Sequence, residues 1–210
     1  MLNIIYEDKY LIVVNKPAKL LTISNAKEKE KTLYHLVSLY LKKKNNKNKI
    51  FIVHRLDYDT SGLIVFAKSE KIKESLQDDW NNVIRKYMAV LDGKLIKKEG
   101  VIQSYLKETK TLMTYSCKDK KGKLAITEYK VIKSQNNFTL VELNIKTGRK
   151  NQIRVHMKDL GHPIIGDTKY GNIKNKFMLL HAYYLEFQHP ITNKKVCLEA
   201  KLPNYFKILA

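Results

Sequence analysis

The sequence predicts an α+β fold built mainly from antiparallel strands with a few flanking helices. Short runs rich in β-branched and aromatic residues recur along the chain, whereas three segments have the apolar spacing of an amphipathic helix. Turn-forming residues separate successive strand-like runs, which favours antiparallel neighbours. The 210 residues are 44% hydrophobic with eight glycines and four prolines, so one globular domain over 1–210 can bury a substantial core.

The first elements expected are a strand, a helix and two buried strands. Residues 10–14 form an apolar, β-branched run that stops at the polar residues 15–17, which predicts a strand entering a loop. Apolar residues at helical spacing predict a helix over 31–43. Runs at 50–53 and 63–67 predict two strands, and the polar segment between them can direct its side chains into a cleft.

The middle of the chain is expected to form a second helix and then a series of strands. Ser69 is placed to cap the first turn of this helix. A tight turn is expected at Asn136-Asn137. The strand-like runs cover 85–91, 100–106, 112–117, 125–132 and 138–145.

A third helix and two further strands are expected near the end of the chain. The helix spans 150–160 and ends at Gly161, and the strands span 179–187 and 195–202. The buried side of this third helix is predicted to carry Ile153, Met157 and Leu160.

The chain carries a large excess of positive charge. It has 40 Lys and Arg residues against 20 Asp and Glu, a formal net charge of +20. Such a field favours polyanionic partners, of which nucleic acids are the commonest soluble class. The alternative is that lysine merely covers the surface, as the segment KKKNNKNK at 42–49 suggests.

Arginine is rare among these cations, with only four positions: Arg55, Arg85, Arg149 and Arg154. A guanidinium is always charged and makes bidentate contacts with carboxylate or phosphate, so these positions are candidates for specific contacts. Chance placement is the alternative.

Several classes of protein are disfavoured. No run approaches 18 apolar residues, and the first residues lack the pattern of a signal peptide. Cys117 and Cys197 stand 80 positions apart without the Cys/His spacing of a zinc site, which favours reduced thiols. We therefore expect a cytoplasmic protein that holds no metal and, without a heptad pattern, is a monomer.

The segment HRLDYDTSGLIVFAK at 54–68 resembles the signature of the RluA-type pseudouridine synthases, usually written HRLDxxTSGLLxFAK. Four other segments agree with this family in the same order, which are EDKYLIVVNKP, RKYMAVLDG, TGRKNQIRVHMKDLGHPIIGDTKYG and LLHAYYLEFQHP. The resemblance implies a catalytic domain with a central mixed sheet and a deep RNA-binding cleft. Because the motifs begin within the first twenty residues, no N-terminal S4 domain is expected.

The resemblance implies isomerisation of uridine in rRNA or tRNA without a cofactor. Asp57 matches the family's catalytic aspartate, a nucleophile of the kind that glycosidases also use. Whether it attacks C1′, adds to the base or supports a glycal route stays open. Arg154 matches the basic residue that pairs with this aspartate and favours its ionised form, and Tyr87 matches the tyrosine that contacts the base. A solvent-facing arginine and an ordinary core tyrosine are the alternatives.

Further residues of these motifs are candidates for RNA binding. The target base must leave its stack, and Arg55 matches a family arginine that fills the gap and contacts the backbone. Thr60 either binds phosphate or caps the next element. Arg149 and Gln152 are expected to position the backbone or support the site. His54 is a candidate RNA contact, although a structural hydrogen bond is the default for the motif histidines.

Three positions qualify the resemblance. Asp59 suggests a paired-carboxylate site with Asp57, but a role in satisfying turn amides is preferred. Asn151 stands where the family most often has histidine, and Lys19 stands where it has glycine.

Two other functions stay open, namely an RNA-binding factor without catalysis and a glycosylase that releases the base.

Binding to RNA should depend steeply on salt, because lysine contacts to phosphate release counterions. Raising the salt concentration from 50 to 200 mM is expected to weaken the affinity by at least about tenfold. Filter binding with total RNA measures this change, and an affinity that does not respond to salt would contradict the electrostatic interpretation.

Overall fold

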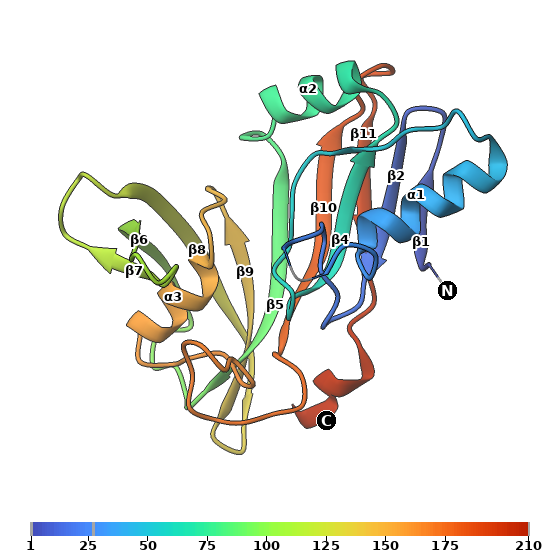
Figure 1. Ribbon diagram of the computed structural model, residues 1–210. Helices are drawn as coiled ribbons and strands as arrows, with labels where there is room; N and C mark the ends of the chain where they lie inside the picture. Colours follow the sequence, from blue (N-terminus) through green and yellow to red (C-terminus); the bar gives the residue numbers. More distant parts are fainter. Residues whose placement is uncertain (1, 27, 210) are drawn as a thin grey trace. The chain divides into compact units, whose positions relative to one another are not determined.

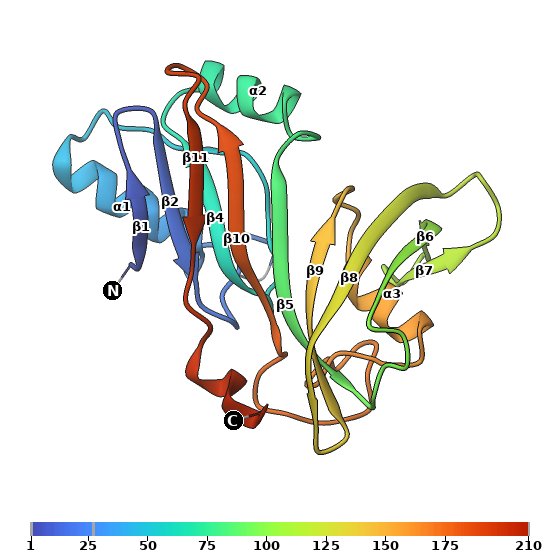
Figure 2. The same ribbon diagram turned by 180° about the vertical axis from the view of Figure 1, so that it is seen from behind.

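The computed structural model describes residues 2–26 and 28–209 (Figures 1 and 2). The chain divides into two compact units, of which unit 1 spans Met1–Val83 and Ala182–Lys201 and unit 2 spans Ile84–His181 and Leu202–Ala210. The expected single domain over 1–210 stays a prediction. In the part of the chain that is described, no helix has the length and apolarity required to cross a membrane.

Unit 1 combines an antiparallel set of strands with two helices. Its elements are β1 (Ile4–Glu7), β2 (Leu11–Lys16), α1 (Leu33–Lys44), β3 (Phe51–Ile52), β4 (Ser61–Ala67), α2 (Glu70–Asp78), most of β10 (Leu180–Gln188) and β11 (Lys195–Glu199). The strand order is β1-β2-β4-β10, while β3 pairs with β4 and β11 pairs with β10. The helix α1 lies over one face of these strands, which stand behind it in Figure 1 and in front of it in Figure 2.

The strand β4 forms the centre of the unit 1 core because all seven of its residues are buried. Leu63 and Val65 belong to a cluster with Ile72 and Leu76 of α2, so this helix packs its apolar side against the sheet. Ser69 caps α2 as predicted, since its side chain accepts a hydrogen bond from the backbone N–H of Ile72.

Unit 2 is an antiparallel sheet with one α-helix. Its elements are β5 (Ile84–Asp92), β6 (Glu99–Glu108), β7 (Thr114–Cys117), β8 (Lys123–Gln135), β9 (Phe138–Ile145), α3 (Gln152–Asp159) and a 3₁₀ helix (Asn204–Leu209). The strand order is β5-β9-β8-β6-β7. Asn136 and Asn137 adopt φ of 49° and 63°, the left-handed conformation that the predicted β8–β9 turn requires. The helix α3 packs against β7 and β8.

The α+β prediction is confirmed, and so are the positions of the three α-helices. The strand β1 was not predicted, because its four residues are all half-buried and show no alternation between apolar and polar positions. The predicted buried side of α3 was incomplete, since the helix buries every residue from Gln152 to Met157 whereas Leu160 is only partly buried.

Gly62, at the start of β4, should tolerate no side chain. Its φ is +120°, and a Cβ atom would lie 2.2 Å from the backbone oxygen of Ala182. Gly161 is the matched control, because its φ is +82° but a Cβ atom would meet nothing within 4 Å. We expect Gly161→Ala to lower the free energy of unfolding by about 1–2 kcal/mol, and Gly62→Ala to lower it clearly more. Urea denaturation measures both losses, and equal losses would contradict the close approach.

Candidate active site

Asp57 lies in the loop between β3 and β4 of unit 1, where its side chain is half-buried. The backbone N–H of Thr60 donates to the carbonyl of Asp57 at 3.2 Å and closes a turn. On the other side, Thr22 Oγ1 donates to the carbonyl of Leu56 at 2.8 Å and accepts from its N–H at 3.3 Å. The backbone is therefore held on both sides of this carboxylate.

A buried lysine also contacts the loop that carries Asp57. Lys16 is 0% exposed. Its ammonium donates to three backbone carbonyls, those of Pro17 (3.0 Å), Leu20 (2.7 Å) and Tyr58 (3.2 Å). Burial lowers the pKa of Lys16 to about 7, while the charges of Asp57 and Asp59 oppose this shift. Lys16 was predicted to lie in the loop after the strand at 10–14, with no assigned role, whereas it is the last residue of β2. It belongs to the NKP segment of the family resemblance.

The other predicted residues of unit 1 differ in exposure. The side chain of Arg55 is exposed, as the predicted contact with RNA requires. Thr60 is only 3% exposed, which favours its structural alternative over a phosphate contact. His54 Nε2 accepts from the N–H of Val65 at 3.2 Å, and its ring lies 4.6 Å from that of Trp80. His54 thus has the structural hydrogen bond expected by default, and its contact with RNA stays a prediction.

Tyr87 lies on β5 of unit 2, two residues after Arg85 on the same side of the strand. Both side chains are buried, with exposed fractions of 9% and 6%. Burial lowers the pKa of Arg85, and the ionised form of Tyr87 opposes this shift. A Cβ atom on Gly148 would lie 3.0 Å from Arg85 Nη1, so this guanidinium borders the TGR segment.

Arg154 projects from α3 into a buried ion pair. Its Nε donates to Asp167 Oδ2 at 2.8 Å and its Nη2 donates to Asp167 Oδ1 at 2.7 Å. The guanidinium carbon also lies 5.1 Å from the ring centre of Tyr170. Arg154 is 7% exposed, which excludes the solvent-facing alternative. Asp167 and Tyr170 were not predicted, although both belong to a segment that carried the resemblance.

Gln152 and Arg149 hold the segment before α3 against β8. Gln152 Oε1 accepts from Thr147 Oγ1 at 2.7 Å and from the N–H of Arg149 at 3.0 Å. Its amide nitrogen donates to the carbonyl of Ile126 and to Thr127 Oγ1, both at 2.9 Å. The exposed Arg149 side chain donates from Nε to the carbonyl of Leu124 at 2.8 Å. These contacts agree with the expected positioning role, and contact with RNA stays a prediction.

Two motif histidines make the structural contacts that were expected of them. His156 lies 2.9 Å from Thr127 Oγ1 through Nδ1 and 3.0 Å from Ser104 Oγ through Nε2, and burial lowers its pKa to about 4. His162 Nδ1 lies 2.8 Å from the carbonyl of Asp92.

A family model described as RNA pseudouridylate synthase matches residues 10–159. The chain belongs to this family. The match confirms the resemblance carried by HRLDYDTSGLIVFAK, which lies inside the matched range. As a member, the chain is an RNA pseudouridine synthase, an isomerase whose substrate is RNA.

Two relatives and one solved structure show the extent of the similarity. Ribosomal large subunit pseudouridine synthase C of Rickettsia bellii is 42% identical, and the match covers 97% of this chain and 69% of the relative. An uncharacterized RNA pseudouridine synthase of Bacillus subtilis, YhcT, is 37% identical over 99% of this chain and 71% of the relative. The structure of human RNA pseudouridylate synthase domain containing 4 shares the fold, with a TM-score of 0.82, 24% identity and coverage of 98% of this chain and 90% of that one.

The buried ammonium of Lys16 should make stability depend on pH. Its pKa is about 7 in the folded chain against 10.5 for an ordinary lysine, so the unfolded chain binds more protons between these values and stability rises with pH. We expect the wild type to gain about 1–3 kcal/mol over Lys16→Met between pH 7 and 9, at 1.36 kcal/mol per pKa unit.

Urea denaturation of both proteins at several pH values measures this difference. Lys9→Met is the control, because the side chain of Lys9 is exposed and its replacement should leave the pH slope unchanged. A constant difference between wild type and Lys16→Met would contradict the prediction.

Proposed function

We propose that this pseudouridine synthase isomerises uridine in ribosomal or transfer RNA, with Asp57 as its catalytic nucleophile. The observation that carries this proposal is the loop of Asp57, whose backbone is held by Lys16 and Thr22 while the carboxylate stays half-buried. A nucleophile must be held in a reactive geometry and still be reachable by substrate. Asp57 meets both requirements.

The proposed reaction balances without an added reagent. The N1–C1′ bond of uridine breaks, the uracil turns, C5 bonds to C1′, and the proton lost from C5 is matched by one gained at N1. No electrons are transferred, so the proposal requires no redox cofactor. Asp57 either forms a covalent adduct or stabilises the cationic sugar, as carboxylates do in glycoside hydrolysis.

We assign supporting roles to two residues of unit 2. Arg154 is proposed to pair with Asp57 and to orient its carboxylate. Tyr87 is proposed to contact the uracil, because an aromatic ring can stack against a base face.

The target base must be flipped out of its stack, at a cost of a few kcal/mol. Arg55 is proposed to occupy the gap, because it precedes Asp57 by two positions and its side chain is exposed. A guanidinium can stack on neighbouring bases and bind phosphate, so one side chain can serve both purposes. RNA is proposed to lie in the cleft that the family resemblance implies.

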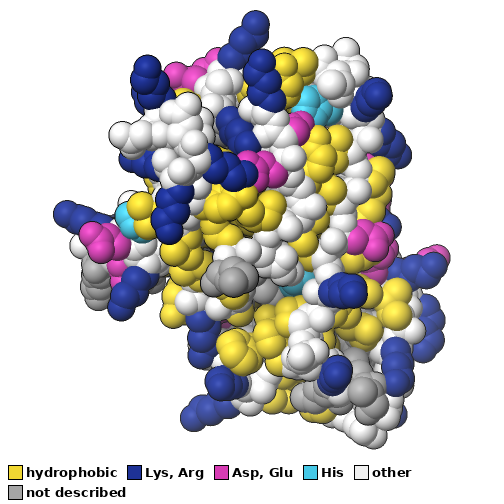
Figure 3. Space-filling model, turned by 90° about the vertical axis from the view of Figure 1, so that its right-hand side faces the viewer, with side chains coloured by type: hydrophobic (Ala, Val, Ile, Leu, Met, Phe, Trp, Pro, Cys, Tyr) yellow, Lys and Arg dark blue, Asp and Glu magenta, His cyan; other side chains and the backbone are white. Residues whose placement is uncertain are grey.

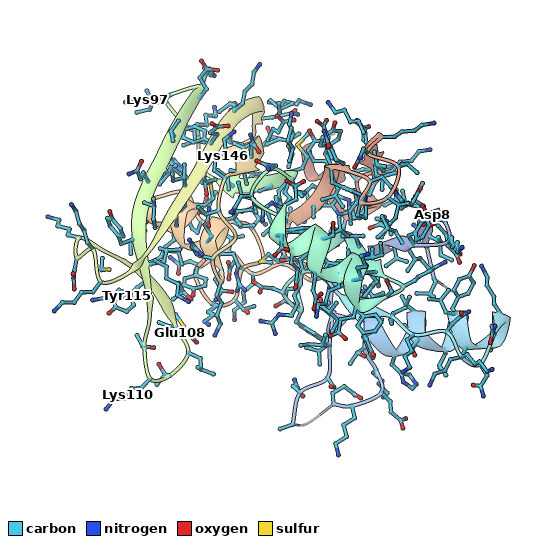
Figure 4. All side chains as sticks on the ribbon, turned by 90° about the horizontal axis from the view of Figure 1, so that it is seen from above. Asp8, Lys97, Glu108, Lys110, Tyr115 and Lys146 are labelled. Carbon is cyan, nitrogen blue, oxygen red and sulfur yellow. The ribbon has the colours of Figure 1, made fainter. Side chains whose placement is uncertain are left out.

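The surface charge supports a large RNA as substrate. Lysine and arginine side chains are spread over the face shown in Figure 3 and outnumber the acidic ones there. In unit 2, Lys97 and Lys110 are exposed and project from opposite ends of β6 (Figure 4). Relatives are named ribosomal large subunit pseudouridine synthases, so ribosomal RNA is the substrate we propose first. We further propose that the enzyme acts as a monomer in the cytoplasm.

Replacing Asp57 by asparagine should abolish the reaction, because an amide is not a nucleophile. The test incubates wild type or Asp57→Asn with total RNA from a strain that lacks the protein, then maps pseudouridine by carbodiimide-dependent reverse-transcription stops. We expect new stops with wild type, none with Asp57→Asn, and RNA affinities of the two proteins within about twofold because phosphate contacts dominate binding.

The matched control is Asp59→Asn, which removes the neighbouring carboxylate and should keep most of the activity. Stops that persist with Asp57→Asn would identify a different nucleophile. Two other outcomes favour the alternative functions: RNA binding without new stops indicates a binding factor, and strand breaks at abasic sites after amine treatment indicate a glycosylase.

A further inference from the structure

We propose that Asp167 is a positioning residue for the reaction, which fixes the direction of the Arg154 guanidinium. This inference rests on the roles of Asp57 and Arg154 under the proposed function. Asp167 lies in the loop that follows α3, the orange segment near that helix in Figure 1.

The contact between the two side chains has the bidentate geometry that restricts a guanidinium most strongly. Two parallel hydrogen bonds of 2.8 and 2.7 Å join Nε and Nη2 of Arg154 to the two oxygens of Asp167. The side chains are 8% and 0% exposed, so water does not compete for these bonds. Engaging Nε and Nη2 sets the plane of the guanidinium, and with it the direction of Nη1.

Asp167 is itself held in place by the backbone. Its Oδ1 also accepts from the N–H groups of Lys169 at 2.9 Å and Tyr170 at 3.0 Å. The preceding Gly166 has φ of +78°, and a Cβ atom there would lie 2.2 Å from the carbonyl oxygen of Phe177. The carboxylate therefore sits on a tight turn whose conformation a larger residue at 166 would disrupt.

A second set of contacts holds the guanidinium over the ring of Tyr170. The Tyr170 hydroxyl accepts from the N–H of Thr114 at 3.0 Å and from Asn151 Nδ2 at 3.1 Å. Asn151 Oδ1 lies 3.5 Å from Arg154 Nη1. Asn151 thus bridges the ring and the guanidinium, at the position where the family most often has histidine.

A gain in folding stability is a weak explanation for the buried pair of Arg154 and Asp167. Removing two charges from water is expensive, and apolar residues of similar volume often stabilise a fold as well as a buried ion pair does. Unlike apolar residues, the ion pair provides a cation whose direction is fixed. Preorganised charge of this kind is what a nucleophilic carboxylate requires from its partner.

A double-mutant cycle tests whether Asp167 acts through Arg154. Single-turnover rates of stop formation are measured for Arg154→Lys, Asp167→Asn and the double variant, with enzyme in excess over total RNA from the strain that lacks the protein. We expect Asp167→Asn to slow turnover by up to about 100-fold, with the RNA affinity changed less than about twofold. The double variant should be no slower than Arg154→Lys alone.

The matched control is Asp159→Asn, which removes one negative charge from the last residue of α3. Asp159 is exposed and accepts a hydrogen bond from Ser116. Its replacement should change the rate less than about twofold, alone or combined with Arg154→Lys. Losses that multiply in the Asp167→Asn, Arg154→Lys double variant would overturn the proposal, because Asp167 would then act independently of Arg154.

A measurement on the wild type keeps the proposal testable if Asp167→Asn does not fold. The chain has only four arginines, so an arginine ¹⁵N spectrum resolves their Nε–H groups, and the signal absent from Arg154→Lys assigns Arg154. We expect its Nε proton to exchange slowly with solvent, and fast exchange would overturn the proposal. Failure of the proposed function is distinguishable, because the wild type would then form no pseudouridine at all.

Discussion

The loop that carries Asp57 depends on one buried interaction, the contact of the Lys16 ammonium with three backbone carbonyls. A lysine that loses all its water is unfavourable unless each N–H group finds an acceptor. Here the acceptors come from the loop that follows β2 and from Tyr58, the residue after Asp57. The same contact therefore compensates the buried charge and joins two loops of unit 1 that are distant in sequence.

Unit 2 also contains a buried cation whose charge must be compensated, but the compensating groups are side chains. Arg154 is buried on α3, and its charge is compensated by the carboxylate of Asp167 and the ring of Tyr170. Both units thus place a buried cation beside a residue of the family motifs and fix it by several partners. The Lys16 ammonium is oriented by backbone carbonyls. The planar guanidinium of Arg154 is oriented by a bidentate carboxylate, which also defines its plane.

Much of the fold could be predicted because local patterns report local geometry. Ser69 caps α2 and the Asn136-Asn137 turn joins β8 to β9, since capping and left-handed turns depend on residues adjacent in sequence. The strand β1 could not be predicted, because a strand whose residues are all half-buried has no alternating pattern and forms only beside its neighbour β2. The buried polar side of α3 was missed for a similar reason, as apolar spacing says nothing about polar residues whose partners lie elsewhere.

By itself the sequence determined the family and the candidates Asp57, Tyr87 and Arg154, because a motif can be recognised without coordinates. Only the tertiary structure decided that Arg154 is buried and that its partner is Asp167, 13 positions along the chain. It alone showed that Lys16 binds the carbonyl of a residue 42 positions away. The physical reason is common to both cases: a buried charge is compensated by whatever groups folding brings within hydrogen-bonding distance, and no local pattern in the sequence encodes that proximity.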